Sequence, residues 1–201
     1  MKLNLCLASS AALLLLTGCT QDYIPAVKDA KLEAYDAQKP LGLVLADYRG
    51  CAPQSQTWSQ KTVDDTTIVT FACKSSDVLD FAASLKQLNL RDDVITPEKK
   101  ALLDLKDAVI RIHFAVSEDG RKIDVESIER EISWADGVTK ALVINAPDKV
   151  ASQMREIQAN KLFLEDARIE RFEGQPEFAR ALGALMSVAA WCELSNIIRQ
   201  E

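Results

Sequence analysis

Acidic side chains are the most plentiful groups in this sequence that could do chemistry. Three of the places that bring two of them close together are candidate sites: Asp92-Asp93, Glu118-Asp119, and Glu129 with Glu131. Two carboxylates are enough to hydrolyse a glycoside when one acts as acid and the other as base or nucleophile. Only Glu129 and Glu131 are spaced to share one face of a strand, because side chains alternate between faces. A carboxylate hydrolase is therefore the weakest of the functions we consider.

A basic pair, Arg111 and His113, lies in the strand that precedes these two acids, and His113 is the one histidine of the chain. The period of two places both residues on the face opposite Ile112 and Phe114. A hydrogen-bonded or solvated strand histidine is one interpretation, and a general base is the other. The sequence has no nucleophile elbow, no histidine pair for zinc, no glycine-rich phosphate loop and no Cys-x-x-Cys motif. We expect neither a cofactor nor a metal.

The strands that must position these groups follow from apolar alternation. Residues 109–116 alternate, and Asp119-Gly120 favours a two-residue hairpin loop that pairs Val116 with Ile123 and Phe114 with Val125. Apolar residues then move from odd to even positions. A shift of one residue would turn the core face outward, so we predict a β-bulge near Glu126-Ser127.

Further elements complete an α+β class, with antiparallel β-hairpins packed against several short helices and one long C-terminal helix. Residues 56–60 and 66–73 form a second hairpin around Asp64-Asp65, with Trp58 opposite Phe71. Asp136-Gly137 turns into a further strand over 138–144. Helices are predicted over residues 26–38, 41–48, 77–88, 96–106, 146–158 and 176–199, while 163–172 fits either a strand or a helix.

The N-terminus has the organisation of a secretory signal. Lys2 precedes an apolar run, residues 3–15, that is too short to cross a bilayer as a mature helix, and Leu16-Thr17-Gly18-Cys19 ends it. This stretch resembles the lipobox of bacterial lipoproteins. The resemblance implies a signal peptide cleaved after residue 18, an acylated Cys19, and a lipidated tether over 19–26. A single periplasmic α+β domain over 27–201 would follow, with 40–92 and 93–201 as its sub-modules. An ordinary secretory signal is the alternative interpretation.

Thr20 bears on which membrane holds the anchor, and the net charge of the chain bears on its binding partners. Thr20 stands where many such lipoproteins carry an aspartate that retains them in the inner membrane. The resemblance therefore implies an anchor in the outer membrane, with the protein facing the periplasm. The net charge of −6 and the pI near 5.0 provide no basic face for nucleic acid.

Cysteine usage fits an oxidising compartment. Cys51 and Cys73 flank the hairpin of residues 56–60 and 66–73 and are the natural disulfide pair. The pattern from Leu41 to Cys73, with Tyr48 and Trp58, also loosely resembles uncharacterised bacterial periplasmic proteins. Cys192 is left over. We place it on the apolar face of the last helix, either as a buried thiol or as a partner for an intermolecular disulfide, in step with Phe178, Leu182, Leu185 and Ala189.

These features favour a non-enzymatic, lipid-anchored protein that binds another envelope protein or component. The alternative is a carrier of a small apolar ligand or lipid, with a pocket on the strand face of Ile110, Ile112 and Phe114. A third group comprises an inhibitor or immunity-type factor and the hydrolase. Trp134 belongs either to the core or, if exposed, to a partner or ligand surface that also includes Arg111 and His113.

Overall fold

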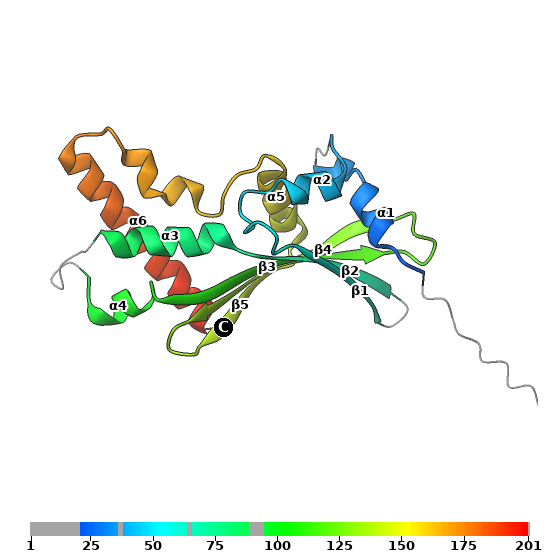
Figure 1. Ribbon diagram of the computed structural model, residues 1–201, viewed down its shortest axis with the longest axis horizontal. Coiled ribbons are helices and arrows are strands. Elements are labelled where there is room, and N and C mark those ends of the chain that lie inside the picture. Colours follow the sequence, from blue (N-terminus) through cyan, green and yellow to red (C-terminus); the bar gives the residue numbers. More distant parts are fainter. Residues whose placement is uncertain (1–20, 36–37, 64–65, 89–94, 201) are drawn as a thin grey trace, which may run out of the picture.

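The computed structural model describes residues 21–35, 38–63, 66–88 and 95–200. It has the predicted α+β class: a five-stranded antiparallel sheet whose strands follow one another in sequence order, with the helices gathered against it (Figure 1). Its elements are α1 (Ile24–Asp29), η1 (Glu33–Tyr35), α2 (Leu41–Ala46), β1 (Thr57–Val63), β2 (Thr66–Lys74), α3 (Ser76–Gln87), α4 (Pro97–Ala101), β3 (Leu105–Val116), β4 (Ile123–Trp134), β5 (Thr139–Ile144), α5 (Pro147–Gln158), η2 (Glu165–Ala167), η3 (Ile169–Phe172) and α6 (Glu177–Gln200).

The central hairpin of β3 and β4 has the predicted register. Val116 lies opposite Ile123 and Phe114 opposite Val125, and Gly120 in the turn has a φ of 69°. The predicted bulge is confirmed, because His113 pairs with Ser127 and leaves Glu126 as an extra residue. That residue moves the buried positions of β4 from odd to even numbers, so both ends of the strand face the core.

The outer strands are also confirmed. In β1 and β2, Trp58 lies opposite Phe71 with ring centroids 5.1 Å apart. Strand β2 pairs with β3 along eight positions, so one sheet joins the predicted sub-modules 40–92 and 93–201. Strand β5 pairs with β4 as the third strand expected after Gly137.

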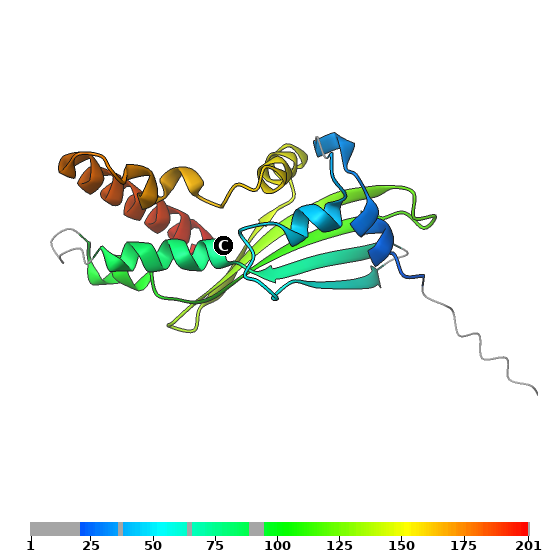
Figure 2. The same ribbon diagram turned by 45° about the horizontal axis from the view of Figure 1, so that its top comes forward.

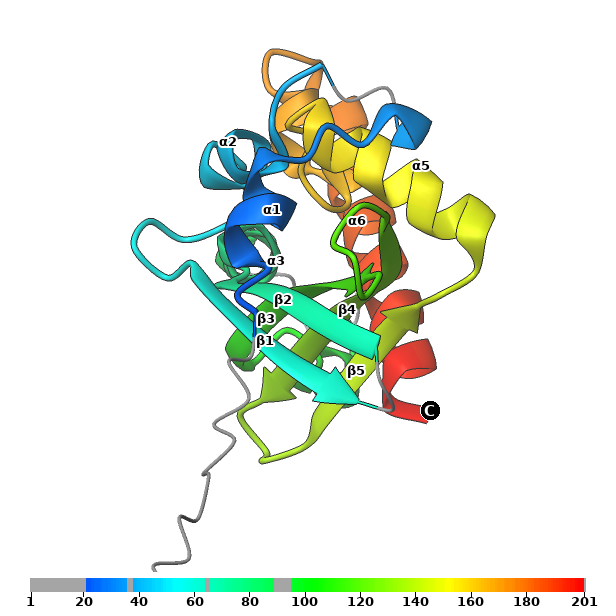
Figure 3. The ribbon, with the colours of Figure 1, turned by 90° about the vertical axis from the view of Figure 1, so that its right-hand side faces the viewer.

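Two groups of helices pack on the same face of this sheet (Figure 3). The first cluster joins α1, α2 and α5 to β2, β3 and β4, with Val150 and Met154 of α5 directed inward as predicted. The second cluster joins α3, the segment after α4, and α6 to the far ends of β3 and β4. The opposite face of the sheet is called the open face below.

Several helices differ from the sequence prediction at their ends. In place of the single helix predicted over 26–38, the described residues of this region form α1 and η1, because Ala30 has an extended conformation that ends the first helix. Helix α4 ends at Ala101 rather than near residue 106, since the chain enters β3 at Leu105. Ser75, not Asp77, is the N-cap residue of α3; Asp77 is buried within the first turn.

The inward face of α6 is not the one that we predicted. Cys192 is buried and free, but Phe178, Leu182 and Leu185 are exposed. The buried side is built mainly from small residues, and a Cβ on Gly183 would lie 2.4 Å from the Phe172 ring. Small side chains allow a close approach of the helix, and this turns the larger apolar side chains outward. In the last turn of the helix, the guanidinium of Arg199 lies 2.6 Å from the Asp136 carboxylate.

The disulfide between Cys51 and Cys73 is present, with a Cα–Cα distance of 5.6 Å. It fixes the segment after α2 to the end of β2, where Cys51 also forms an isolated bridge with Ser75. Both cysteines are buried in the first cluster. The link therefore holds α1 and α2 in place over the sheet.

Replacing both Cys51 and Cys73 with serine should lower the free energy of unfolding by about 3 kcal/mol, because the unfolded chain regains the entropy of a loop of 22 residues. Urea denaturation of the oxidised protein and of the double variant measures this difference. The Cys192→Ser variant is the control. Reduction of its Cys51–Cys73 disulfide should lower its free energy of unfolding by as much as reduction lowers that of the wild-type protein. A loss below about 1 kcal/mol would contradict the proposed role of the link.

Candidate functional site

Four of the residues that the sequence singled out as candidates meet on the open face of the sheet. Arg111 and His113 project from β3, and Glu129 and Glu131 project from β4 beside them. Thr70 of β2 completes the group. Strand alternation places these side chains together, and the bulge at Glu126 falls beyond them. We call these five residues the open-face cluster.

Arg111 is the centre of the open-face cluster. Its Nη1 lies 2.6 Å from Glu129 Oε1 and 3.3 Å from Glu131 Oε2. His113 contacts Thr70 Oγ1 through Nδ1 at 3.0 Å, and its Nε2 lies 3.7 Å from Glu129 Oε2. Each charged member is about a quarter to a third exposed, which weakens screening by solvent relative to a surface pair.

The electrostatics favour an ionised, structural cluster. Partial burial lowers the pKa of Arg111, but hydrogen bonds and charges from Glu131 and Glu129 outweigh it, so the pKa is raised above its ordinary value. A glycosidase needs one of its two carboxylates to carry a proton. Here the Arg111 guanidinium contacts both Glu129 and Glu131, so the two carboxylates have the same partner. This geometry does not assign an acid and a base.

A groove of about 640 Å³ runs beside the open-face cluster. His113 and Glu129 form one wall, and Lys61 of β1 lies among the opposing residues. Its lining is largely polar, and Val143 is its most exposed apolar side chain. The groove can bind a polar ligand by hydrogen bonds, but it has no group poised as a nucleophile.

Trp134 does not belong to this surface, and its assignment to a partner or ligand surface is wrong. Its side chain is fully buried, and Nε1 donates a hydrogen bond to the Leu102 carbonyl at 3.1 Å. Trp191 Nε1 donates to the same carbonyl at 2.8 Å. The Leu102 carbonyl thus accepts from both indole N–H groups inside the second cluster, and β4 and α6 meet at this one oxygen.

The strand face that a carrier would require is closed. Ile110, Ile112 and Phe114 are at most 1% exposed and pack within the first cluster. Helices α1, α2 and α5 cover them, rather than the C-terminal helix. An apolar ligand has no room at that position.

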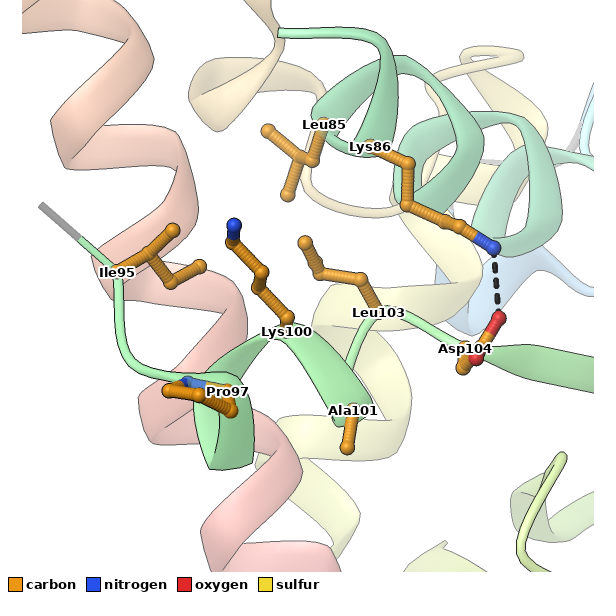
Figure 4. A pocket seen from close by; sticks show the side chains of 8 residues that line it. All are labelled: Leu85, Lys86, Ile95, Pro97, Lys100, Ala101, Leu103 and Asp104. Atoms are coloured by element: carbon orange, nitrogen blue, oxygen red, sulfur yellow. Dashed lines mark hydrogen bonds and ion pairs between the residues drawn. The ribbon is translucent and has the colours of Figure 1, made fainter. Parts of the chain in front are cut away.

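A smaller apolar hollow of about 460 Å³ lies between α3 and α4 (Figure 4). Leu85, Ile95 and Leu103 form its walls, and Lys100 extends across it. Lys86 and Asp104 form an ion pair of 2.6 Å at its rim. The walls belong to the second cluster, so the hollow is a continuation of the core rather than a chemically equipped site.

The outward side of α6 carries the largest group of exposed apolar side chains along one described element. Phe178 is 80% exposed, Met186 60%, Leu182 48% and Leu185 43%. We call these four residues the α6 surface. A hollow of about 790 Å³ adjoins it at Leu185, between α6 and Phe172. We predicted that three of these residues, Phe178, Leu182 and Leu185, face the core. The stripe of Gly183, Ala184 and Ser187 was the signal that could have located the true inward face.

Helix α6 is also long and apolar enough, by length and composition, to cross a membrane, and it is the one such helix within the described part of the chain. In the most apolar stretch of α6, 44% is buried inside the protein. A core helix of a soluble domain meets the same criteria, so this property assigns no membrane role.

The remaining predicted groups carry no site. Asp119 lies in the β3–β4 turn, where hydrogen bonds from Ser117 and the Arg121 backbone lower its pKa. Burial raises the pKa of Cys192, which disfavours the reactive thiolate. Within the described residues, no three histidine, cysteine, aspartate or glutamate side chains gather to hold a metal ion. Asp64-Asp65, Asp92-Asp93 and Cys19 lie outside the described residues.

Comparisons of the chain with protein-family models, with curated proteins and with solved structures found no match.

Replacing Arg111 with methionine should lower the free energy of unfolding by about 1–2 kcal/mol at pH 7, because Glu129 and Glu131 lose their shared partner. Urea denaturation at pH 7 measures this loss. Arg121→Met removes an arginine that is 88% exposed and serves as the control. Equal losses for both variants would contradict a cohesive open-face cluster.

Proposed function

We propose that the protein is a lipid-anchored envelope protein that acts by binding another protein, with the α6 surface as its contact site. The lipobox-like Leu16-Thr17-Gly18-Cys19 supports the anchor. The observation that carries the binding function is the exposure of four large apolar side chains on one side of a well-packed helix. Contiguous exposed apolar patches of this kind are typical of interaction sites.

The direction of the chain at its N-terminus supports a protein partner rather than the anchoring membrane. Only residues 20–22 separate Cys19 from Tyr23, so the tether spans roughly 14 Å when extended. The chain leaves the fold at one end of the long axis, whereas α6 begins at the opposite end (Figures 1 and 2). A lipid on Cys19 would therefore hold the Tyr23 end near the membrane and leave the start of α6 away from it.

The charges around the α6 surface favour a partner with basic residues at its rim. Glu173 and Glu177 border the adjoining hollow, and Glu193 is exposed farther along the helix. Arg180 is the basic residue among the lining of the hollow. Complementary charges at a rim direct the encounter and the orientation of two proteins. We infer a partner that presents an apolar surface bordered by lysine or arginine.

Replacing Cys19 with serine should move the protein from the membrane fraction to the soluble fraction, because the acyl chains supply the membrane affinity. Fractionation of cell envelopes, with intact mass of the purified protein, measures both location and lipid. Cys192→Ser is the matched control and should stay membrane-bound. A membrane-bound Cys19→Ser protein would contradict the anchor.

A photo-crosslinking residue at position 186 should form a discrete product with another protein in intact envelopes. The same residue at Ser59, exposed on the open face, is the control and should not form it. Introducing Leu182→Glu, on the same face, should reduce the yield at least tenfold, as expected when charge enters a hot spot. Asn196→Glu adds the same charge at an exposed position farther along α6 and should leave the yield unchanged.

Three results would contradict the proposal: a product with lipid, a product between two copies of this chain, or equal yields from the Leu182→Glu and Asn196→Glu proteins. A Cys19→Ser version of the crosslinking protein separates the anchor from the contact. The Cys19→Ser version is also mixed, after purification, with membranes that contain the partner. If it forms no product there as well as in cells, the anchor itself forms the contact.

A further inference from the structure

The centre of the helix-covered side of the sheet contains a buried arginine. Arg130 projects from β4 between Ile128 and Ile132, at the boundary between the two clusters, and is 3% exposed. Its guanidinium lies over the Phe163 ring, 4.2 Å from the centroid. A buried charge is costly unless it is paired and fully hydrogen-bonded.

The hydrogen bonds of Arg130 are incomplete. Nη2 donates to Gln153 Oε1 at 3.4 Å, which is long for such a bond. Nε and Nη1 are buried and have no well-aligned hydrogen-bond partner, although the Tyr48 hydroxyl lies beside the guanidinium. No salt bridge among the described residues includes Arg130. Native proteins seldom leave buried donors unpaired, so these nitrogens call for an explanation.

Nearby groups do not supply the missing negative charge. Asp77 is buried, but its carboxylate accepts hydrogen bonds from Ser75 Oγ, Val78 N and Phe163 N. The pKa of Tyr48 is raised above its ordinary value, mainly by burial. The neighbouring Arg130 lowers this pKa and Asp77 raises it, so a neutral phenol lies near both charged groups. A second guanidinium, Arg168, donates Nη2 to the Asp77 carbonyl and has a buried Nε without a partner. Among these groups, two guanidiniums, of Arg130 and Arg168, therefore lie near a single carboxylate, that of Asp77.

An open pocket of about 540 Å³ lies between α5 and residues 161–171, and Arg130 itself is not part of its lining. Gln153 and Phe163, the two side chains that contact the guanidinium, both line this pocket. Its acidic lining residues are already engaged: Glu156 accepts from Gln153 Nε2, Glu165 from Leu162 N, and Asp166 pairs with Arg171. Access to Arg130 thus requires movement of one amide side chain.

We propose that the pocket binds a small oxyanion, a carboxylate or a phosphate group, on Arg130. An anionic oxygen would take the place of Gln153 Oε1 at Nη2. Because Nη2 shares one edge of the guanidinium with Nε and the other with Nη1, the anion gains a bidentate contact on either edge. This site lies apart from the α6 surface and is independent of the proposed function.

Isothermal titration with inorganic phosphate and with acetate, at constant ionic strength, tests this site. The full-length protein should bind one equivalent of at least one anion, and the tighter of the two assigns the class. Gln153→Glu should weaken that binding at least tenfold, because an internal carboxylate then occupies Nη2, and should raise the melting temperature. Gln153→Ala removes the competing amide and should strengthen binding. Gln175→Glu, which adds the same charge at an exposed position, should change neither property.

Several results would overturn the site. Binding of neither anion by the wild-type protein would do so. Equal affinities for the wild-type and Gln153→Glu proteins would place the anion elsewhere, and an equal loss in the Gln175→Glu protein would reduce the effect to overall charge. A Gln153→Ala protein that folds but binds no anion would show that the amide supports the ligand instead of competing with it.

Discussion

The rest of the structure depends on the alternation of buried side chains along β3 and β4. Every second residue of both strands faces the helices, from Ala108 to Val116 and from Ile128 to Trp134. Burial of these side chains is the main stabilising term of the fold, and it requires that register be kept along twelve residues of each strand. The bulge at Glu126 makes this compatible with the turn at Gly120. The same alternation gathers Arg111, Glu129 and Glu131 on the open face.

This dependence explains why much of the sheet could be predicted from the sequence. Alternation, the Asp119-Gly120 turn and the phase change near Glu126 are local signals, and each one restricts the register. The Cys51–Cys73 disulfide and the Trp58–Phe71 pair could be predicted because a hairpin brings its two strands side by side. The convergence of Glu129 and Glu131 on one face was likewise predictable, although their common contact with Arg111 required knowledge of how β3 and β4 pair.

The features that could not be predicted depend on contacts between distant segments. Phe172 packs closely against Gly183 of α6. The small residues of the helix mark its inward face, but no local pattern identifies Phe172 as the side chain that packs there. A period of 3.6 residues would have favoured the larger side chains as the inward face. Trp134 is buried because Leu102 offers a carbonyl that also accepts from Trp191, 57 residues farther along the chain than Trp134. The burial of Arg130 also arises from packing. A polar residue at a core-facing position interrupts the alternation of a strand, and the sequence alone does not show that such a residue is buried.

Accessibility of the α6 surface in the native envelope is the most direct test of the central claim that this surface contacts a partner. A Met186→Cys protein can be labelled with a maleimide in intact envelopes and after purification, with Ser59→Cys as the open-face reference. We expect position 186 to react at least tenfold more slowly in the envelope than in the purified protein, while position 59 reacts equally in both. Equal labelling of position 186 in the two states would contradict the account, because the exposed apolar side of α6 would then have no partner to cover it.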